Sequence, residues 1–152
     1  MKWLAVIVLL FYALPPVGYS AEDQAIFNPP DPVIQEFVRL VNAKRRSVGC
    51  AELKWDSKVA AIAWGHSADM ASRHFFSHTN PDGKGHFERL RESRLDFSAA
   101  AENIALGPKT AREAFDTWVG SAGHRKNMLD GRFTRHGVAR VEDTWTHVLI
   151  RP

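Results

Sequence analysis

The chain of 152 residues lacks several features that mark common protein classes, and it has very little cysteine. Cys50 is the only cysteine, so no disulfide can form within the chain and stability has to come from packing. We take Cys50 as a small, partly buried apolar residue, with a reactive thiol or an intermolecular link as the open alternative. Hydrolase and nucleotide-binding signatures are also missing, because the sequence has no His-Glu-x-x-His, no Gly-x-Ser-x-Gly and no glycine-rich nucleotide loop.

The sequence also lacks an apolar run long enough to span a membrane. Residues 4–14 are uncharged and apolar, but a spanning helix needs about 20 such residues, whereas an export signal needs about 7–15. Lys2 precedes this run, and small residues follow it up to Ser20. We predict a signal peptide at residues 1–20, a flexible leader at 21–30 and one domain at 31–152. The mature protein would then lie in the periplasm or outside the cell, without a transmembrane anchor.

Positive charge is only slightly in excess, with a formal net charge of +3 at pH 7. The one tight basic run is Lys44, Arg45 and Arg46. A nucleic-acid-binding protein would show a denser basic face with aromatic residues between the charges, so we exclude nucleic acid as a partner. We expect a monomer whose partner is a small molecule, a lipid or a component of the cell envelope.

Helical and extended patterns alternate along the rest of the chain. Residues that favour helix starts stand at Asp31, Asp56, Thr110 and Ser121, each followed by a helical pattern, and a further short helix is predicted at 86–93. Extended segments are predicted at 53–55, 100–106, 133–141 and 144–150, the last two as a hairpin with its turn at 142–143. This order predicts an α+β fold in which helices pack on a small antiparallel sheet.

Seven histidines are many for a chain of this size, and their sequence context ranks them. His66 shares the apolar stripe of the second helix, which favours a core histidine bonded to a neighbour such as Asp69. His147 alternates with apolar residues on the last strand and is either a core-edge residue or part of a site wall. Three others lie among charged or turn residues and are predicted to be exposed: His74, His86 and His136.

Two histidines and one acid stand out as candidates for chemistry. His78 and His124 each follow a small residue where a helix meets a loop, a position from which side chains project into concave surfaces. Glu102 lies in an otherwise apolar strand, where an unpaired carboxylate would be costly. Imidazole suits it, because a carboxylate can orient one ring nitrogen and leave the other free for a metal or a proton. The pattern alone leaves open whether such a pair is functional or structural.

A series of short motifs runs through the chain in a characteristic order. The motifs are His-Ser-Ala-Asp-Met-Ala at 66–71, Phe-Phe-Ser-His-Thr-Asn-Pro-Asp-Gly at 75–83, Glu-Asn-Ile-Ala at 102–105, Trp118 with Ser-Ala-Gly-His-Arg-Lys-Asn-Met-Leu at 121–129, and Phe-Thr at 133–134 before Gly-Val at 137–138. Together they resemble the CAP superfamily of cysteine-rich secretory proteins, antigen 5 allergens and pathogenesis-related proteins, in its bacterial SCP-like branch.

The resemblance implies an α-β-α sandwich and a central cleft in which two histidines and two acids hold a divalent metal. Matched by position, the cleft residues are His78, Glu102, Ser121 and His124, and the implied metal ligands are His78, His124 and Glu102. The second acid is missing, because Ser121 stands in its place, and Ala101 replaces the glycine that usually precedes the first acid. Two imidazoles favour Zn²⁺ or another first-row ion as the cofactor.

Two classes of function compete. The first is a secreted, non-enzymatic module that binds a ligand, a lipid or an envelope component, since a fold alone does not establish an activity. The second is a metal-assisted hydrolase or peptidase acting on extracellular or cell-wall peptides, with Glu102 as the base. A factor that acts through protein contacts is a third possibility, without a specific motif. Ser121 in place of the second acid counts against catalysis, so we favour the binding module.

Overall fold

Five helices and four strands make up residues 31–152, the part of the chain that the computed structural model describes. The predicted signal peptide and leader lie outside the described residues. The elements are α2 (Pro32–Ser47), β1 (Lys54–Trp55), α3 (Ser57–Arg73), α4 (His86–Glu92), β2 (Ala99–Leu106), α5 (Ala111–Gly120), α6 (Ala122–Leu129), β3 (Arg135–Val141) and β4 (Thr144–Arg151). No helix in this part of the chain is both long and apolar enough to cross a membrane.

Local sequence signals place most of these elements where they were predicted. The side chains of Asp31, Asp56 and Thr110 each accept a backbone hydrogen bond from the first turn of the helix that follows. Ser121 stands at the N-cap of α6, but within the described residues its side chain makes no capping hydrogen bond. The last hairpin turns at residues 142–143 as predicted, and Glu142 adopts a positive φ of 53° there.

The four strands form one sheet in the order β1-β3-β4-β2. β4 is central and pairs antiparallel with both β2 and β3. β1 is the exception to the predicted antiparallel pattern, because Lys54 and Trp55 pair with β3 in parallel, which makes the sheet mixed.

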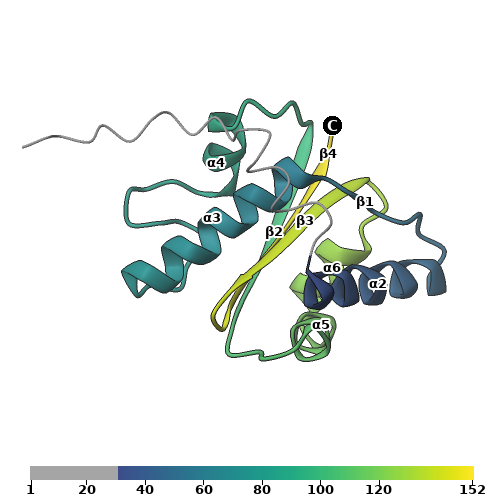
Figure 1. Cartoon of the computed structure of the whole chain (residues 1–152). Helices are drawn as coiled ribbons and strands as arrows, with labels where there is room; N and C mark the ends of the chain where they lie inside the picture. The colour runs from purple at the N-terminus through teal and green to yellow at the C-terminus, as the bar shows by residue number, and fades with distance from the viewer. Residues whose placement is uncertain (1–30) are drawn as a thin grey trace, which may run out of the picture.

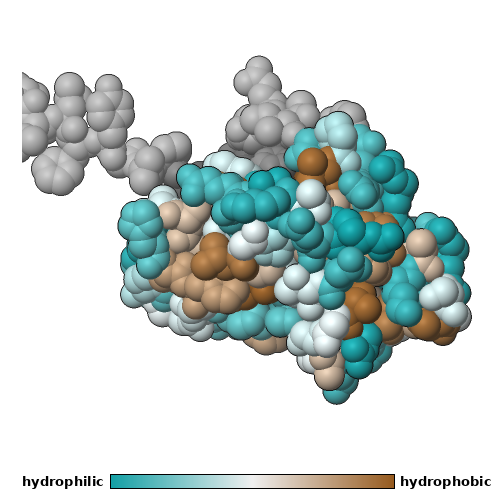
Figure 2. Space-filling view, turned by 90° about the horizontal axis from the view of Figure 1, so that it is seen from below, coloured by the Kyte–Doolittle hydropathy of each residue, from teal (hydrophilic) through white to brown (hydrophobic). Residues whose placement is uncertain are grey.

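Helices cover both faces of this sheet, as expected for an α-β-α sandwich. Figure 1 shows α3 and α4 on one face and α2, α5 and α6 on the other. Alternation along β4 feeds the two cores: Trp145 and Leu149 pack in the α2 and α5 core, whereas Val148 and Ile150 pack against α3. The large exposed apolar side chains belong to different segments of the chain: Val48, Trp64, Phe76, Phe87 and Leu106. The face shown in Figure 2 has several apolar areas separated by hydrophilic residues.

Helix α3 lies very close to strand β3 at Gly137. A Cβ atom added there would lie 2.1 Å from the backbone nitrogen of Ala60 and 2.5 Å from the carbonyl carbon of Val59. Both neighbours are backbone atoms, which cannot swing aside as a flexible side chain would. Glycine at 137 is therefore what allows α3 to lie directly on the sheet.

One member of the basic run is a core residue. Arg45 is fully buried, and its guanidinium donates hydrogen bonds to the carbonyl oxygens of Ala51, Met128, Asp130 and Phe133. Desolvation by burial lowers the pKa of Arg45. These bonds tie the end of α2 to the segment between α6 and β3.

The prediction that His136 is exposed is wrong, whereas His74 is exposed as predicted. His136 follows Arg135 at the start of β3, where strand alternation turns its side chain inward, against Trp55 and His147. His147 is also fully buried, which makes it a core residue. The charged neighbours of His136 in the sequence suggested a surface position, but helices cover both faces of the sheet at β3, so residues 136–139 are all buried.

Candidate functional site

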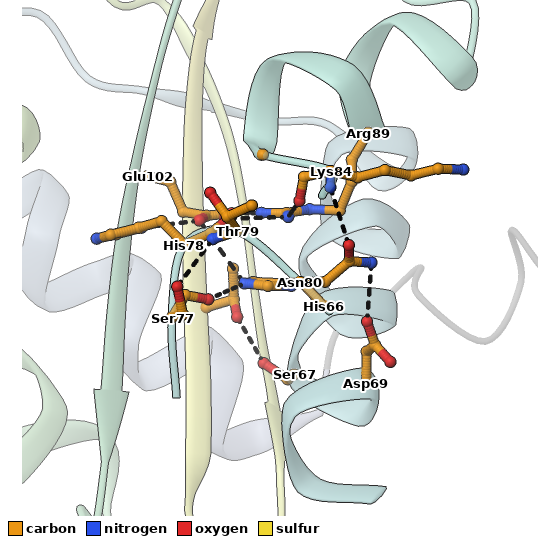
Figure 3. A network of polar contacts seen from close by, with 12 residues as sticks. His66, Ser67, Asp69, Ser77, His78, Thr79, Asn80, Lys84, Arg89 and Glu102 are labelled. Atoms are coloured by element: carbon orange, nitrogen blue, oxygen red, sulfur yellow. Dashed lines mark hydrogen bonds and ion pairs between the residues drawn. The ribbon is translucent and has the colours of Figure 1, made fainter. Parts of the chain in front are cut away.

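Glu102 is the centre of a polar network on the α3 side of the sheet. It lies on β2 opposite Val148, and 5% of its surface is exposed. One carboxylate oxygen, Oε1, lies 2.9 Å from His78 Nδ1, and the other, Oε2, accepts a hydrogen bond of 2.6 Å from Arg89 Nη2. Figure 3 shows these side chains converging from β2, α4 and the loop between α3 and α4. Both oxygens of the buried acid therefore have partners.

Arg89 on α4 is a site residue that the sequence analysis missed. Besides Glu102, its guanidinium donates to the backbone carbonyl oxygens of His78, at 3.0 Å, and Lys84, at 2.9 Å. Its side chain is only 11% exposed. Arg89 thus fixes both ends of the loop that carries His78 and neutralises the carboxylate that orients it. The available signal was the buried acid itself, which requires a cation as well as an imidazole.

His66 on α3 also takes part in the network, but its partner is not the predicted Asp69. Its Nε2 lies 3.0 Å from the carbonyl oxygen of Ser77 and 3.8 Å from Glu102 Oε1. Asp69 instead accepts hydrogen bonds from Arg73 and Asn80. The predicted burial of His66 is confirmed, and desolvation by this burial lowers its pKa.

The loop that follows α3 is held by its own polar side chains. Asn80 Oδ1 accepts hydrogen bonds from the backbone N–H groups of Asp82 and Lys84, and its amide donates to Asp69 at 3.1 Å. Arg73 forms a bidentate ion pair with Asp82 on the exposed side. The turn-forming sequence at 77–85 therefore folds into a braced loop that presents His78 at a defined place.

His78 combines a fixed ring with an exposed edge. Its Nδ1 contacts the buried Glu102 oxygen, while 48% of its side chain is exposed. A carboxylate at Nδ1 selects the tautomer and orientation of the ring and leaves Nε2 free for a ligand. The predicted pairing of His78 with Glu102 is present in the structure.

His124 approaches the site from the opposite layer. The buried Asn103 donates a hydrogen bond of 3.1 Å to the carbonyl oxygen of His124, and Asn127 donates one of 2.9 Å to Asn103. Two adjacent residues of β2 thus position the two histidines. Glu102 orients the ring of His78, and Asn103 holds the helix α6, which carries His124. Partial burial, and after it the electrostatic interaction with His78, lower the pKa of His124. Within residues 31–152, the buried His124 Nδ1 has no hydrogen-bond partner.

His86 is half-buried, so its predicted exposure is wrong. It begins α4, and the charges of Glu102, Arg89 and His78 all act on it. Burial is the main cause that lowers its pKa. The glycine-rich turn before it suggested a surface position, but the start of α4 lies near the polar network and the ring packs against Phe87.

The donor set for a metal is narrower than the resemblance implies. Among residues 31–152, no group of three or more histidine, cysteine, aspartate or glutamate side chains is arranged to hold an ion. Glu102 is engaged by Arg89 and His78 and is suited to orienting His78 rather than to coordination. The free donors are the imidazoles of His78 and His124, and binding of Zn²⁺ or another ion stays a prediction.

The comparison with known families decides the assignment. The CAP profile, described as the cysteine-rich secretory protein family, matches residues 38–148. The chain belongs to the CAP family. That match includes all four predicted site residues, and the resemblance drawn from the motifs is confirmed.

Bacterial proteins are similar to this CAP domain in sequence and in structure. YkwD of Bacillus subtilis is 36% identical over 118 residues, which are 76% of this chain and 46% of YkwD. YlbC of the same organism, named a membrane protein, is 35% identical over 117 residues, or 77% of this chain and 34% of YlbC. The chain thus spans less than half the length of these curated relatives.

A solved structure supports the same fold. An extracellular protein containing a SCP domain from Bacillus anthracis matches with a TM-score of 0.76 and 35% identity, over 78% of this chain and 40% of that one. The α-β-α arrangement around the mixed sheet is therefore the CAP fold of a bacterial family member.

Proposed function

We propose that this CAP domain is a non-enzymatic binding module that acts outside the cytoplasm and holds its ligand with His78 and His124. The observation that carries the proposal is the engagement of both Glu102 oxygens by Arg89 and His78. An acid bound in this way keeps a neighbouring imidazole in place but is a poor proton acceptor. The predicted signal peptide and the extracellular description of the Bacillus anthracis relative support the location.

The electrostatics of Glu102 also argue against a catalytic base. Burial by itself would raise its pKa, but the hydrogen bond from His78 and the charges of Arg89 and His66 prevail and lower it. A general base works best when its pKa lies near the working pH. Glu102 is therefore a permanent anion at neutral pH, with the task of orienting His78.

We propose that the ligand is a component of the cell envelope with a polar or anionic group that contacts the imidazoles of His78 and His124. A divalent cation could bind the same two imidazoles. Metal affinity should be modest, because the proposed set offers only two imidazoles, with Glu102 already engaged by Arg89 and His78. The formal charge of +3 includes Lys2 of the predicted signal peptide, and the positive excess that remains adds a weak attraction to anionic polymers.

Calorimetric titration with Zn²⁺ tests the two-imidazole site. We expect the full chain to bind Zn²⁺, and His78→Ala and His124→Ala each to weaken binding at least about tenfold, since each removes one of two donors. His74→Ala is the matched control, because His74 is exposed at the end of α3. Equal affinities in all four proteins would remove His78 and His124 as metal ligands.

Co-sedimentation with insoluble peptidoglycan and with anionic lipid vesicles tests the binding role without metal. We expect the full chain to sediment with one of these materials and the His78→Ala and His124→Ala variants to stay in solution. Sedimentation that is unchanged in both variants would contradict a recognition role for the two histidines.

The alternative is a metal-assisted hydrolase, which the carboxylate-oriented imidazole of His78 favours. Peptides and peptidoglycan fragments incubated with the full chain distinguish the two classes. We expect no turnover. Hydrolysis that disappears both on chelation and in Glu102→Gln, with the variant still folded, would replace the binding module by the hydrolase.

A further inference from the structure

Two histidines that the site does not use are packed against each other in the α2 core. His136 on β3 and His147 on β4 have no exposed surface, and His136 Nδ1 lies 3.0 Å from His147 Nε2. Aromatic rings surround the pair: Trp55 lies against His136, and Phe37 and Trp118 lie against His147. The pair thus joins the two hairpin strands under the layer formed by α2 and α5.

Counting protons shows why the pair tolerates only its neutral form. Within residues 31–152, the outer nitrogens, His136 Nε2 and His147 Nδ1, are buried without hydrogen-bond partners. Two neutral rings carry two N–H groups, one of which forms the hydrogen bond between them. The other N–H and one lone pair face apolar surroundings. A third proton would add a second buried donor without an acceptor.

The charges around the pair make a third proton still less favourable. Arg45 of α2 acts on both rings, and Cys50 and Asp130 in turn act on Arg45. The ring contacts from β1, α2 and α5 come from Trp55, Phe37 and Trp118, and among the ion pairs of the described domain none joins a carboxylate to either ring. A protonated pair would therefore place a cation beside Arg45 in the core, without an anion.

We propose that the His136–His147 pair is an acid-sensitive lock on the fold, which holds α2 and α5 against the sheet only while both rings are neutral. This device is separate from the proposed ligand site, since neither histidine contacts His78, Glu102 or His124 in the described contacts. Acidification weakens the lock because the rings accept protons only when they leave the core.

The sign and size of the effect follow from proton binding. In the unfolded chain each ring binds a proton with a pKa of about 6.5. Burial and Arg45 lower the pKa of His136 to about 3, and burial, His136 and Arg45 lower that of His147 well below its usual value. The contribution of the pair to the stability of the folded domain is therefore fully present above pH 6.5 and is lost as the pH falls below it. Below that pH each ring reduces the folding constant about tenfold per pH unit, and the pair about a hundredfold.

Urea unfolding of the full chain between pH 7.5 and 5 measures this slope. We expect His147→Gln, which retains a hydrogen-bond partner for His136, to remove about one factor of ten per pH unit from the pH dependence. His74→Gln is the matched control and should leave the slope unchanged. His66, His86 and His124 contribute to the slope in all three proteins, so the difference isolates the pair. Identical slopes in the three proteins would overturn the proposal.

Ring-nitrogen NMR of the unmutated chain decides the question even where the variant does not fold. We expect the signals of His136 and His147 to remain those of neutral rings for as long as the domain is folded, including at pH 5. Titration of either ring near pH 6.5 in the folded protein would show that the core accepts the proton and would overturn the proposal.

Discussion

The ion pair between Arg89 and Glu102 shows how one residue on α4 determines the state of the site. The carboxylate is buried on an apolar strand, and Arg89 is its cationic partner at 2.6 Å. Breaking a buried pair on one side leaves an uncompensated charge, so we expect Arg89→Met to lower the free energy of unfolding by about 3–5 kcal/mol. Arg73→Met is the control, because the Arg73–Asp82 pair is exposed and should contribute little.

Chemical denaturation of the two arginine variants measures this difference. A loss in Arg89→Met no larger than in Arg73→Met would mean that Glu102 does not depend on Arg89. Glu102 could be predicted as a site residue because a charge in an apolar strand needs a partner. Arg89 could not, since its role arises only when α4 folds back beside β2, and nothing in the local sequence fixes that packing.

The contact between α3 and β3 depends on Gly137 at the scale of whole elements. We expect Gly137→Ala to lower the free energy of unfolding by about 3 kcal/mol or more, because the new Cβ would overlap the backbone of Ala60. Gly123→Ala is the matched control, since Gly123 lies in α6 with open space around it and alanine should stabilise the helix by about 0.5–1 kcal/mol. Thermal unfolding followed by circular dichroism measures both. A neutral Gly137→Ala would show that α3 can shift without loss.

Elements with strong local signals were predictable, and those defined by distant partners were not. Asp56 caps α3 at the predicted place, and the hairpin turn at 142–143 follows directly from alternation on both sides. The parallel pairing of β1 with β3 joins residues about 80 positions apart and leaves no local trace. The burial of His136 could not be predicted from its charged sequence neighbours either, because it arises from helices that cover both faces of the sheet and bury residues 136–139 alike.

We expect the whole domain to unfold as one unit, because its two cores share a single sheet. The α2 core contains Phe37, and the α3 core contains Leu90, both fully buried. Since β3 and β4 contribute residues to both cores, loss of packing on one face removes support from the other. We expect Phe37→Ala to lower the free energy of unfolding by about 3–5 kcal/mol and Leu90→Ala by about 2–5 kcal/mol. Both variants should unfold in a single cooperative transition at a lower temperature or urea concentration.

Tryptophan fluorescence and far-ultraviolet circular dichroism distinguish one unit from two. Trp118 and Trp145 lie in the α2 core, so fluorescence follows that side once Trp64→Phe has removed the tryptophan of α3, whereas circular dichroism follows all helices. Coincident unfolding curves in Phe37→Ala and in Leu90→Ala would support a single unit. Separate curves in Leu90→Ala, with the fluorescence transition unshifted, would mean that the α3 layer opens alone. The braced loop bearing His78 would then be released while the helix bearing His124 stayed in place, and the two histidines would no longer form one site.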